Sequence, residues 1–459
     1  MSPTLACLLG VGCGPSDGVS PLAAPEIVTT SVAANPHNVV SLMVTAELEN
    51  ADSAVVRYGR AGEALDSTTA AVRPDAGSAS VPVFGLLPET SYALRIVAHG
   101  SEEAVERDLP SFVTGSLPAD LPSYSASGSD PSPGYVVLAA GRYGLAIDNT
   151  GRVVWYHAFP IGPGLNFQAQ PNARYVARPP PPDAATVAPW VEIDPLGNQT
   201  RTLGCARGLQ PRFHDLIASP TGDYWLMCDE TRVMDLSAHG GSVEAEVMGT
   251  VVQHLSAEGI LLFEWSAFDH FAITDLEPAS LLGAAVNWTH GNALDLDDDG
   301  NLIVSFRSLH EVTKIDASTG SVMWRMGGLR NQFAFHGSPT PAFARQHGVR
   351  ATAAGRLTLL DNSGDALASR AESYEYDPDR RTAQLVASYA PTIAVNARLG
   401  GTTQTLPGGR TLVAFGDGGR VQEYDNDGAV VWEIDGDAGY VFRAERIRSL
   451  YHPGVDAPH

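Results

Sequence analysis

A strand–turn–strand unit recurs along residues 135–459, and this repeat limits the possible folds more than any other feature of the chain. Six such hairpins have a turn rich in Asp, Asn or Gly, and they begin at Tyr143, Trp190, Val252, Val312, Ser373 and Val421. A second kind of hairpin precedes each of the last four, as in "HGNALDLDDDGNLIVSFRS". Each pair of hairpins gives four strands in about 40–60 residues, which is the repeat length of a propeller blade. The sequence therefore predicts an all-β fold with a six-bladed β-propeller over residues 135–459.

The residues before the propeller divide into three further segments. Residues 24–116 alternate apolar and polar residues in short runs, which predicts a small β-sandwich. Within them, "LLPETSYALRIVA" followed by "SFVTGS" resembles a fibronectin type III domain, with Leu87 and Tyr92 as its leucine and its corner tyrosine. That resemblance implies a spacer or adhesion module without chemistry of its own. Residues 117–134 are rich in Pro, Ser and Gly and predict a linker, and residues 1–23 predict a leader and linker.

The cysteines bear on the compartment of the protein. The N-terminal "MSPTLACLLGVGCGPSDG" resembles the end of a bacterial lipoprotein signal, with Cys13, or else Cys7, as the lipidated residue. This predicts export to the periplasm or the cell surface with a lipid anchor on the membrane; a disordered tail is the alternative. Cys205 and Cys228 are too few and too far apart for a zinc site. In an exported protein they could form a disulfide, or they could remain two separate buried thiols.

The charge balance excludes several kinds of partner. The chain has 52 acidic and 29 basic residues, and its formal net charge is −23. Such a chain repels phosphate backbones, so we expect no nucleic-acid partner, and a small anion would need a local basic pocket. No apolar run reaches the length of about 18 residues that a membrane-spanning helix needs. The acidic "DLDDDGN" that begins at Asp295 resembles a calcium loop but has Phe306 where the loop needs a bidentate acid, so we expect a solvated turn, no bound metal and no cofactor.

Three histidines recur at one position of the repeat. His214, His290 and His347 each lie at or just before the first residues of the innermost strand of a unit. The innermost strands of a propeller run along the central channel and end near one mouth, so the three imidazoles should converge there. The alternative is a structural role in which each histidine bonds a neighbouring backbone. In the sixth unit, "GTTQTLPGG", the equivalent place is Thr402 or Thr403.

Two arginines are candidates for the cation of such a site. Arg370 precedes an outer hairpin of the fifth unit, and Arg307 occupies a similar turn one unit earlier. Turns at these places face a propeller mouth, and a guanidinium there could bind an oxyanion through two parallel hydrogen bonds. The alternative for Arg370 is a surface arginine in a flexible loop.

The propeller region resembles the bacterial arylsulfate sulfotransferases that do not use a nucleotide sulfate donor. The resemblance depends on "NWTHGNALDLDDDGNLIVSFR", "VTKIDASTGSVMWRMGG", "QHGVRATAAGRLTLLDN", "SRAESYEYD" and "RTLVAFGDGGRVQEYDNDGAVVWEI", in that order. It implies a six-bladed propeller, export, and His290, His347 and Arg370 as catalytic residues; we add His214 and Arg307 as substrate-binding residues. The family also has a histidine in its sixth blade that accepts the sulfuryl group covalently. This chain has no histidine in the corresponding Ala414–Asp425.

The expected activity is therefore the transfer of a sulfuryl group from a phenolic sulfate ester to a phenol. Such a reaction develops negative charge on the leaving phenolate oxygen, and cationic or N–H donors aimed at that oxygen lower the barrier. Histidine can donate, accept or attack near neutral pH, so His347 or His290 could act as acid–base or replace the missing nucleophile. The alternative function is a non-catalytic propeller that binds a ligand or a protein at the cell surface, and a propeller enzyme acting on a quinone or a sugar is a weaker third possibility.

Overall fold

The computed structural model describes residues 23–183, 186–353, 355–362 and 368–455. The chain divides into two compact units. The first comprises Met1–Ala33, Met43–Val81 and Ser91–Phe112, and the second comprises Ala34–Leu42, Pro82–Thr90 and Val113–His459. Cys7 and Cys13, on which the predicted lipid anchor depends, lie outside the described residues.

The strands between residues 26 and 113 form two sheets. One has the order β1-β2-β5 and the other the order β4-β3-β6-β7. Their bounds are β1 Glu26–Ala34, β2 Leu42–Glu49, β3 Ser53–Arg60, β4 Ser67–Thr68, β5 Ser78–Val83, β6 Ser91–His99 and β7 Ala104–Val113. Buried and exposed residues alternate along β2, which is the pattern of a strand with one face against a core. Tyr92 of β6 is buried, whereas Leu87 is only half-buried and its neighbour Leu86 takes the buried position.

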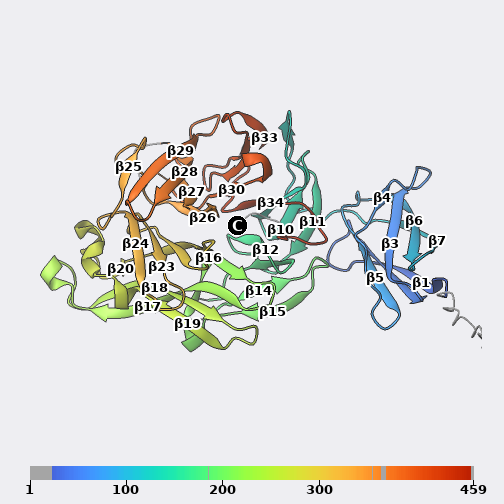
Figure 1. The fold of residues 1–459 in the computed structure, drawn as a ribbon, viewed down its shortest axis with the longest axis horizontal. Helices are drawn as coiled ribbons and strands as arrows, with labels where there is room; N and C mark the ends of the chain where they lie inside the picture. The colour runs from blue at the N-terminus through green and yellow to red at the C-terminus, as the bar shows by residue number, and fades with distance from the viewer. Residues whose placement is uncertain (1–22, 184–185, 354, 363–367, 456–459) are drawn as a thin grey trace, which may run out of the picture. The chain divides into compact units, whose positions relative to one another are not determined.

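Among the described residues, six sheets of four or five strands make up most of the second unit. In Figure 1 they surround a common centre, with β12, β16, β26, β30 and β34 innermost, which is a propeller-like arrangement.

The strands of the six sheets have the following bounds. The first sheet contains β9 Tyr135–Ala140, β10 Tyr143–Ile147, β11 Val153–Ala158 and β34 Ala444–Ile447, and the second contains β12 Phe167–Gln170, β13 Arg174–Ala177, β14 Trp190–Ile193 and β15 Gln199–Leu203. The third contains β16 Gln210–Ala218, β17 Tyr224–Met234, β18 Ala245–Leu255, β19 Leu261–Ser266 and β20 Ala285–Asn287, and the fourth contains β21 Gly291–Leu296, β22 Leu302–Phe306, β23 Glu311–Ile315 and β24 Val322–Gly327. The fifth contains β25 Ala334–His336, β26 His347–Ala353, β27 Arg356–Asp361, β28 Arg370–Asp377 and β29 Thr382–Tyr389, and the sixth contains β30 Thr402–Thr405, β31 Thr411–Ala414, β32 Val421–Tyr424, β33 Val430–Ile434 and β8 Ala126–Gly128.

Both ends of this unit pair with a sheet from the opposite end of its sequence. The late strand β34 is antiparallel to β9 and completes the first sheet, and the early strand β8 is antiparallel to β33 and completes the sixth. The segment 117–134, predicted as a linker, therefore contains the short strand β8. The Pro, Ser and Gly composition conceals it because β8 has only three residues and finds its partner about 300 residues away in the sequence, with Trp432 opposite Gly128. The two pairings join the early and late parts of the segment within the same sheets, and the short strand β8 is left at the edge of the sixth sheet.

Buried polar side chains join the innermost strands to one another. At successive junctions an acid or amide of one inner strand accepts a backbone N–H of the next: Ala169 to Glu445, Ala218 to Gln170, Leu294 to Asp215, Ala351 to Asp295 and Arg446 to Gln404. Neighbouring inner strands belong to different sheets, so their backbone groups need side-chain partners. These contacts explain why so many polar residues are buried near the centre of the unit.

Three buried tryptophans make a second set of junctions. The indole N–H of Trp155 donates to the carbonyl of Pro195, that of Trp190 to Arg212, and that of Trp432 to Asn149. In each case the acceptor belongs to the following sheet or to a turn beside it. The large apolar ring of these three residues fills the space between two sheets while its N–H donates to a carbonyl.

The acids of the turn between β21 and β22 are paired with a lysine of β23. Lys314, the only lysine of the chain, lies 2.5 Å from Asp297 and 2.7 Å from Asp299, and Tyr376 donates to Asp297. The ammonium group thus neutralises the acids that resemble calcium ligands. The turn is therefore not simply solvated, as the sequence suggested, because Asp297 and Lys314 are both buried.

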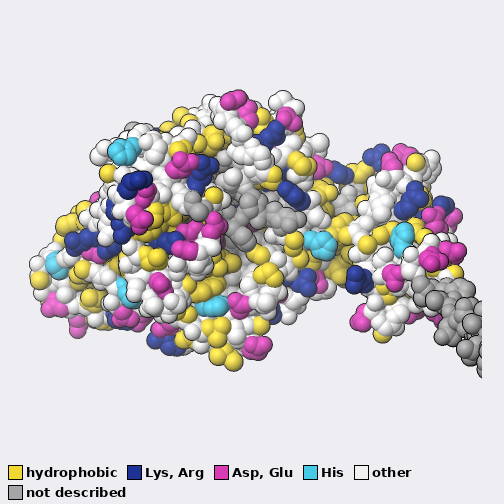
Figure 2. Space-filling view, in the orientation of Figure 1, with side chains coloured by type: hydrophobic (Ala, Val, Ile, Leu, Met, Phe, Trp, Pro, Cys, Tyr) yellow, Lys and Arg dark blue, Asp and Glu magenta, His cyan; other side chains and the backbone are white. Residues whose placement is uncertain are grey.

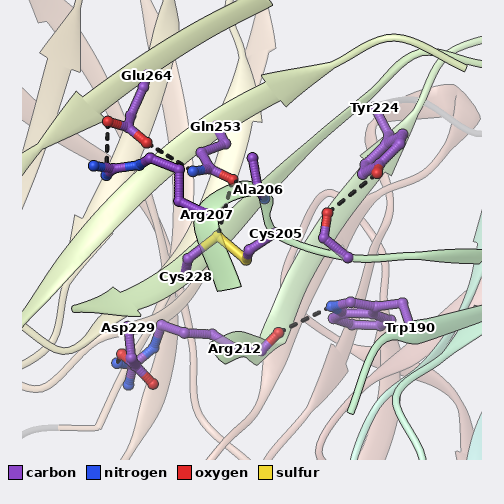
Figure 3. The surroundings of a disulfide bond; sticks show 11 residues. Trp190, Cys205, Ala206, Arg207, Arg212, Tyr224, Cys228, Asp229, Gln253 and Glu264 are labelled. Carbon is purple, nitrogen blue, oxygen red and sulfur yellow. Dashed lines mark hydrogen bonds and ion pairs between the residues drawn. A yellow bond between two sulfur atoms is a disulfide. The ribbon is translucent and has the colours of Figure 1, made fainter. Parts of the chain in front are cut away.

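Cys205 and Cys228 form a disulfide, the first of the two possibilities left open by the sequence. It lies between the end of the second sheet and β17, with Gln253 close by (Figure 3). Cys228 precedes Asp229, whose carboxylate binds the guanidinium of Arg212 in the same view.

Acidic and basic side chains are interspersed on the face shown in Figure 2, and the basic ones are scattered rather than gathered into a patch. Among the described residues, no helix has the length and apolar character needed to cross a membrane.

Candidate anion-binding site

The structure brings His214, His290 and His347 together. The ring centres of His214 and His290 are 5.1 Å apart, and those of His214 and His347 are 6.2 Å apart. His214 lies in β16, His290 just before β21, and His347 at the first residue of β26, so the rings come from three different sheets. His214 and His347 are buried, and His290 is half-buried.

A bulge in β16 directs His214 into this cluster. The pairing of β16 with β17 is interrupted between Pro211 and Leu216, so the residues between them are released from the regular ladder. Asn166 donates to the carbonyl of His214 at 2.7 Å, and Arg443 donates to the same carbonyl at 3.2 Å. These bonds replace the lost ladder bonds and fix the backbone that carries the imidazole.

His290 has a left-handed backbone conformation, with φ of 49°. This conformation is unfavourable for a residue with a Cβ, by about 1–3 kcal/mol, and persists only when the surroundings enforce it. Here the His290 carbonyl accepts the N–H of Arg307, and the next N–H, that of Gly291, donates to Thr250. The side-chain amide of Asn287 lies 2.7 Å from Nδ1 of His290 and donates to it, which leaves the proton of the neutral ring on Nε2.

His347 has the opposite tautomer. Its Nδ1 lies 2.8 Å from Oδ1 of Asn362. The amide nitrogen of Asn362 donates to the carbonyls of Ala397 and Gly400, so its oxygen must be the acceptor and Nδ1 of His347 must carry the proton. The lone pair of the neutral ring is therefore on Nε2. The cluster thus combines a ring that can donate from Nε2, His290, with a ring that can attack or accept through Nε2, His347.

All three imidazoles are neutral near pH 7. Burial lowers the pKa of His214 well below its ordinary value, and Arg212 lowers it further. Burial lowers the pKa of His290 to about 2, with further lowering from Arg212 and Arg307. Burial also lowers the pKa of His347 to about 4, although the bond to Asn362 acts in the opposite direction. The charged side chains with the strongest effect on these rings, Arg212 and Arg307, are both cationic, so the cluster lies in a positive local potential within an acidic protein.

Arg307 is one of the two cations at the cluster. It precedes the turn that leads into β23, and burial and the neighbouring Arg345 lower its pKa. Its Nε is buried and has no hydrogen-bond partner among the described residues, and Nδ1 of His214 is in the same situation. Buried donors without a protein partner are uncommon and costly, and such donors are suited to binding a small anion.

Arg370 is held differently from what the sequence suggested. It lies at the end of β28 paired with Asp361, two strands outward from His347 in the same sheet. Its guanidinium binds Glu372 at 2.6 Å and Asp361 at 3.2 Å. With two carboxylates on one guanidinium, Arg370 contributes no net positive charge. Asp361 is the last residue of β27 and also accepts the N–H of Ala344. The next residue is Asn362, which orients His347, so Arg370 fixes the end of β27 from which Asn362 reaches His347.

Aromatic side chains form one wall of the cluster. Phe213 stacks on His214 with a centroid distance of 4.0 Å, and Phe442 lies edge-on to both His214 and His347. Flat apolar walls beside buried donors suit an aryl group that carries an anion. At the place of the sixth-unit threonines, Thr402 bonds the backbone of Ala444, and the hydroxyl of Thr403 is buried without a partner among the described residues.

Sequence reasoning missed Arg212, Asn362 and the aromatic wall. Arg212 could have been found, because it lies two residues before His214 and alternate residues of a strand share a face. Asn362 had no such signal, since it follows β27 and reaches His347 only through the pairing of β26 with β27. Phe442 comes from the connection before β34, nearly 100 residues beyond His347, and only the closed arrangement of sheets brings it to the cluster.

The fold and the site together define a propeller-like all-β protein in which three histidines from different sheets gather at the ends of inner strands. Residues 211–437, just under half of the chain, match the family model of the arylsulfotransferases (ASST), which supports an arylsulfotransferase assignment at the family level. Among the curated proteins, none matches the chain in sequence.

Several solved structures are similar in fold at low identity. A protein of unknown function from Bacteroides caccae has a TM-score of 0.42 and 14% identity, covering 69% of this chain and 100% of its own. A streptogramin B lyase has a TM-score of 0.39 and 14% identity, covering 69% and 85%, and a virginiamycin B lyase from Staphylococcus aureus has a TM-score of 0.36 and 9% identity, covering 70% and 89%. At these scores the likeness carries no information about function.

Proposed function

We propose that this protein is an aryl-sulfate sulfotransferase with a six-bladed propeller, which moves a sulfuryl group from a phenolic sulfate ester to a phenol without a nucleotide donor. The observation that carries the proposal is the cluster of His214, His290 and His347 beside Arg307. It combines buried donors, an aromatic wall and a positive potential inside a chain of net charge −23. The family match over residues 211–437 supports the same chemistry.

In the proposed reaction, the sulfate group lies between Arg307 and the Nε2–H of His290, which donate to its oxygens. The lone pair on Nε2 of His347 attacks sulfur, the bond from sulfur to the aryl oxygen breaks, and the phenolate leaves with the electron pair. The His347 ring then carries the sulfuryl group and a positive charge, which the bond from Nδ1–H to Asn362 stabilises. The oxygen of the acceptor phenol next attacks sulfur, the N–S bond breaks, and the phenol proton passes to the released phenolate or to water.

His347 thereby replaces the sixth-unit histidine of the family, which this chain lacks. The tautomer fixed by Asn362 supports this assignment, because an imidazole can act as a nucleophile only through an unprotonated nitrogen. Arg370 acts as a positioning residue: it binds Asp361 and thereby fixes the position of the next residue, Asn362. His214 and Arg307 bind the substrate.

The test uses 4-nitrophenyl sulfate as donor and phenol as acceptor. With donor alone we expect the wild-type protein to release one equivalent of coloured 4-nitrophenolate and to gain the mass of one sulfuryl group on His347. Continued release should require phenol. His347→Asn should lose both the release and the added mass. Continued release without an acceptor would identify a sulfatase instead, and no release at all would favour the non-catalytic binding function.

We also propose that the protein is exported and anchored through Cys13, with the strands of residues 24–116 forming a fibronectin type III-like spacer. The disulfide between Cys205 and Cys228 supports an oxidising compartment. Labelling of expressing cells with a radioactive fatty acid tests the anchor: the label should be incorporated in wild type and lost in Cys13→Ser.

A further inference from the structure

Two buried arginines share one carboxylate, and one of the two is close to the histidine cluster. Arg178 follows β13, Arg212 lies in β16, and Asp229 lies in β17; Arg178 and Arg212 are only 8% and 5% exposed. Arg212 binds the carboxylate of Asp229 directly (Figure 3), and Arg178 is close enough to affect the same carboxylate. Two guanidinium charges against one carboxylate leave an excess positive charge in a buried place.

The hydrogen-bonding capacity of this pair is also incompletely used. Nε of Arg178 and Nε of Arg212 are both buried and without a partner among the described residues. Arg443, equally buried and also near His214, is by contrast matched by Asp215, Glu445 and Asn166. Because a buried guanidinium is normally paired and hydrogen-bonded, the unmatched pair points to a ligand that supplies the missing negative charge.

The position of the pair connects it with the proposed substrate pocket. Arg212 is two residues from His214 on the same strand, and its charge is the strongest of those that lower the pKa of both His214 and His290. Arg307, which lies in another sheet, is a separate cation of the cluster. The histidine cluster therefore has two centres of positive charge beside it, and a single sulfate group needs only one of them.

We propose that Arg178 and Arg212 bind an anionic substituent, a carboxylate or a second sulfate, that the aryl substrate carries in addition to its reacting oxygen. A planar guanidinium matches such a group through parallel hydrogen bonds. This inference rests on the proposed function and narrows its substrates to phenols and aryl sulfates with a second acidic group.

The experiment compares two acceptors of nearly equal shape, 4-hydroxyphenylacetate and 4-hydroxyphenylacetamide, with 4-nitrophenyl sulfate as donor. We expect kcat/KM to be about tenfold higher for the acid, since the carboxylate can form charge-assisted hydrogen bonds that the amide cannot form. In Arg178→Gln the ratio of the two values should fall to about one. Arg178→Lys, which keeps the charge, should retain part of the preference for the acid. This variant replaces Arg178→Gln in the experiment if Arg178→Gln does not fold.

The matched control is Arg201→Gln. Arg201 lies in the same sheet as Arg178, is paired with Glu192, and has no contact with the cluster among the described residues, so the ratio should stay at the wild-type value. Calorimetric titration of each acceptor into the protein without donor separates this inference from the proposed function. Tighter binding of the acid without any transfer would overturn the sulfotransferase proposal alone. Equal binding and equal kcat/KM for acid and amide in wild type, or an unchanged preference in folded Arg178→Gln, would overturn the second anion subsite.

Discussion

At the scale of single residues, the imidazoles of the cluster depend on amides and not on acids. Asn362 fixes the tautomer of His347, Asn287 that of His290, and Asn166 the backbone of His214. A carboxylate in place of Asn362 would raise the pKa of His347 and would also neutralise the cations that attract a sulfate. Amides orient the rings without adding charge, and this preserves both the free lone pair and the positive potential.

The pH dependence of the reaction follows from the lowered pKa of His347. Its neutral form is the nucleophile, and with a pKa of about 4 it stays neutral from mildly acidic to alkaline pH. We expect kcat/KM for 4-nitrophenyl sulfate to be flat between about pH 5.5 and 8 and to fall tenfold per unit below about pH 4. The donor is anionic throughout, so its own titration does not contribute. A midpoint near pH 6.5, where an exposed histidine titrates, would contradict the proposed burial of the nucleophile.

Arg307 and Arg370 should differ in their kinetic effects. Arg307→Gln removes a donor to the sulfate, and we expect a rise in KM of about tenfold to a hundredfold for the loss of one or two charge-assisted bonds. Arg370→Gln should leave KM nearly unchanged and lower kcat, because its effect passes through Asp361 and Asn362 to the orientation of His347. Steady-state kinetics with 4-nitrophenyl sulfate distinguish the two, and a raised KM in Arg370→Gln would assign it to sulfate binding as the sequence implied.

At the scale of elements, five junctions between neighbouring sheets have a polar contact at the inner strand, and three junctions have an indole ring further out. Asp295 accepts the backbone N–H of Ala351, and the indole of Trp190 donates to the carbonyl of Arg212. Since the site is made of strand ends from different sheets, its geometry depends on these junctions more than on any single hairpin. Asp295 is buried, and this burial raises its pKa.

The acidic turn before β22 provides a stability prediction for one element. Lys314→Met would leave the buried carboxylate of Asp297 without its cation, and removal of one partner of a buried pair costs about 3–5 kcal/mol. We expect a decrease of this size in the free energy of unfolding, measured with urea. The double variant Lys314→Met, Asp297→Asn should recover most of it. An unchanged stability of the single variant would mean that water, or Tyr376 alone, satisfies Asp297.

At the scale of the whole molecule, the repeated hairpins and histidine positions could be predicted from the sequence, whereas the pairings between distant segments could not. The hairpins and the meeting of His214, His290 and His347 follow from periodicity, since equivalent positions of a propeller face the same mouth. The partner of β8, the pairing of Arg370 with acids, and the approach of Phe442 depend on contacts between distant segments that no local pattern encodes. The strand β8 within the predicted linker could not be foreseen for the same reason, because three residues carry too little pattern to indicate a strand.

The pairing of β8 with β33 leaves no room for a side chain at Gly128. A Cβ on Gly128 would meet the carbonyl oxygen of Val431 and lie 2.9 Å from Cα of Trp432, so a larger side chain must push β8 away from β33. Gly128→Val should therefore lower the free energy of unfolding by about 1–3 kcal/mol, the usual cost of overpacking, and should expose the free edge of β33 to pairing between molecules. Denaturant unfolding and light scattering measure the two effects. Ser127→Ala on the same strand removes only an exposed bond to Asp435 and should change neither. Equal behaviour of the two variants would mean that β8 is dispensable and that the pairing of β34 with β9 closes the ring by itself.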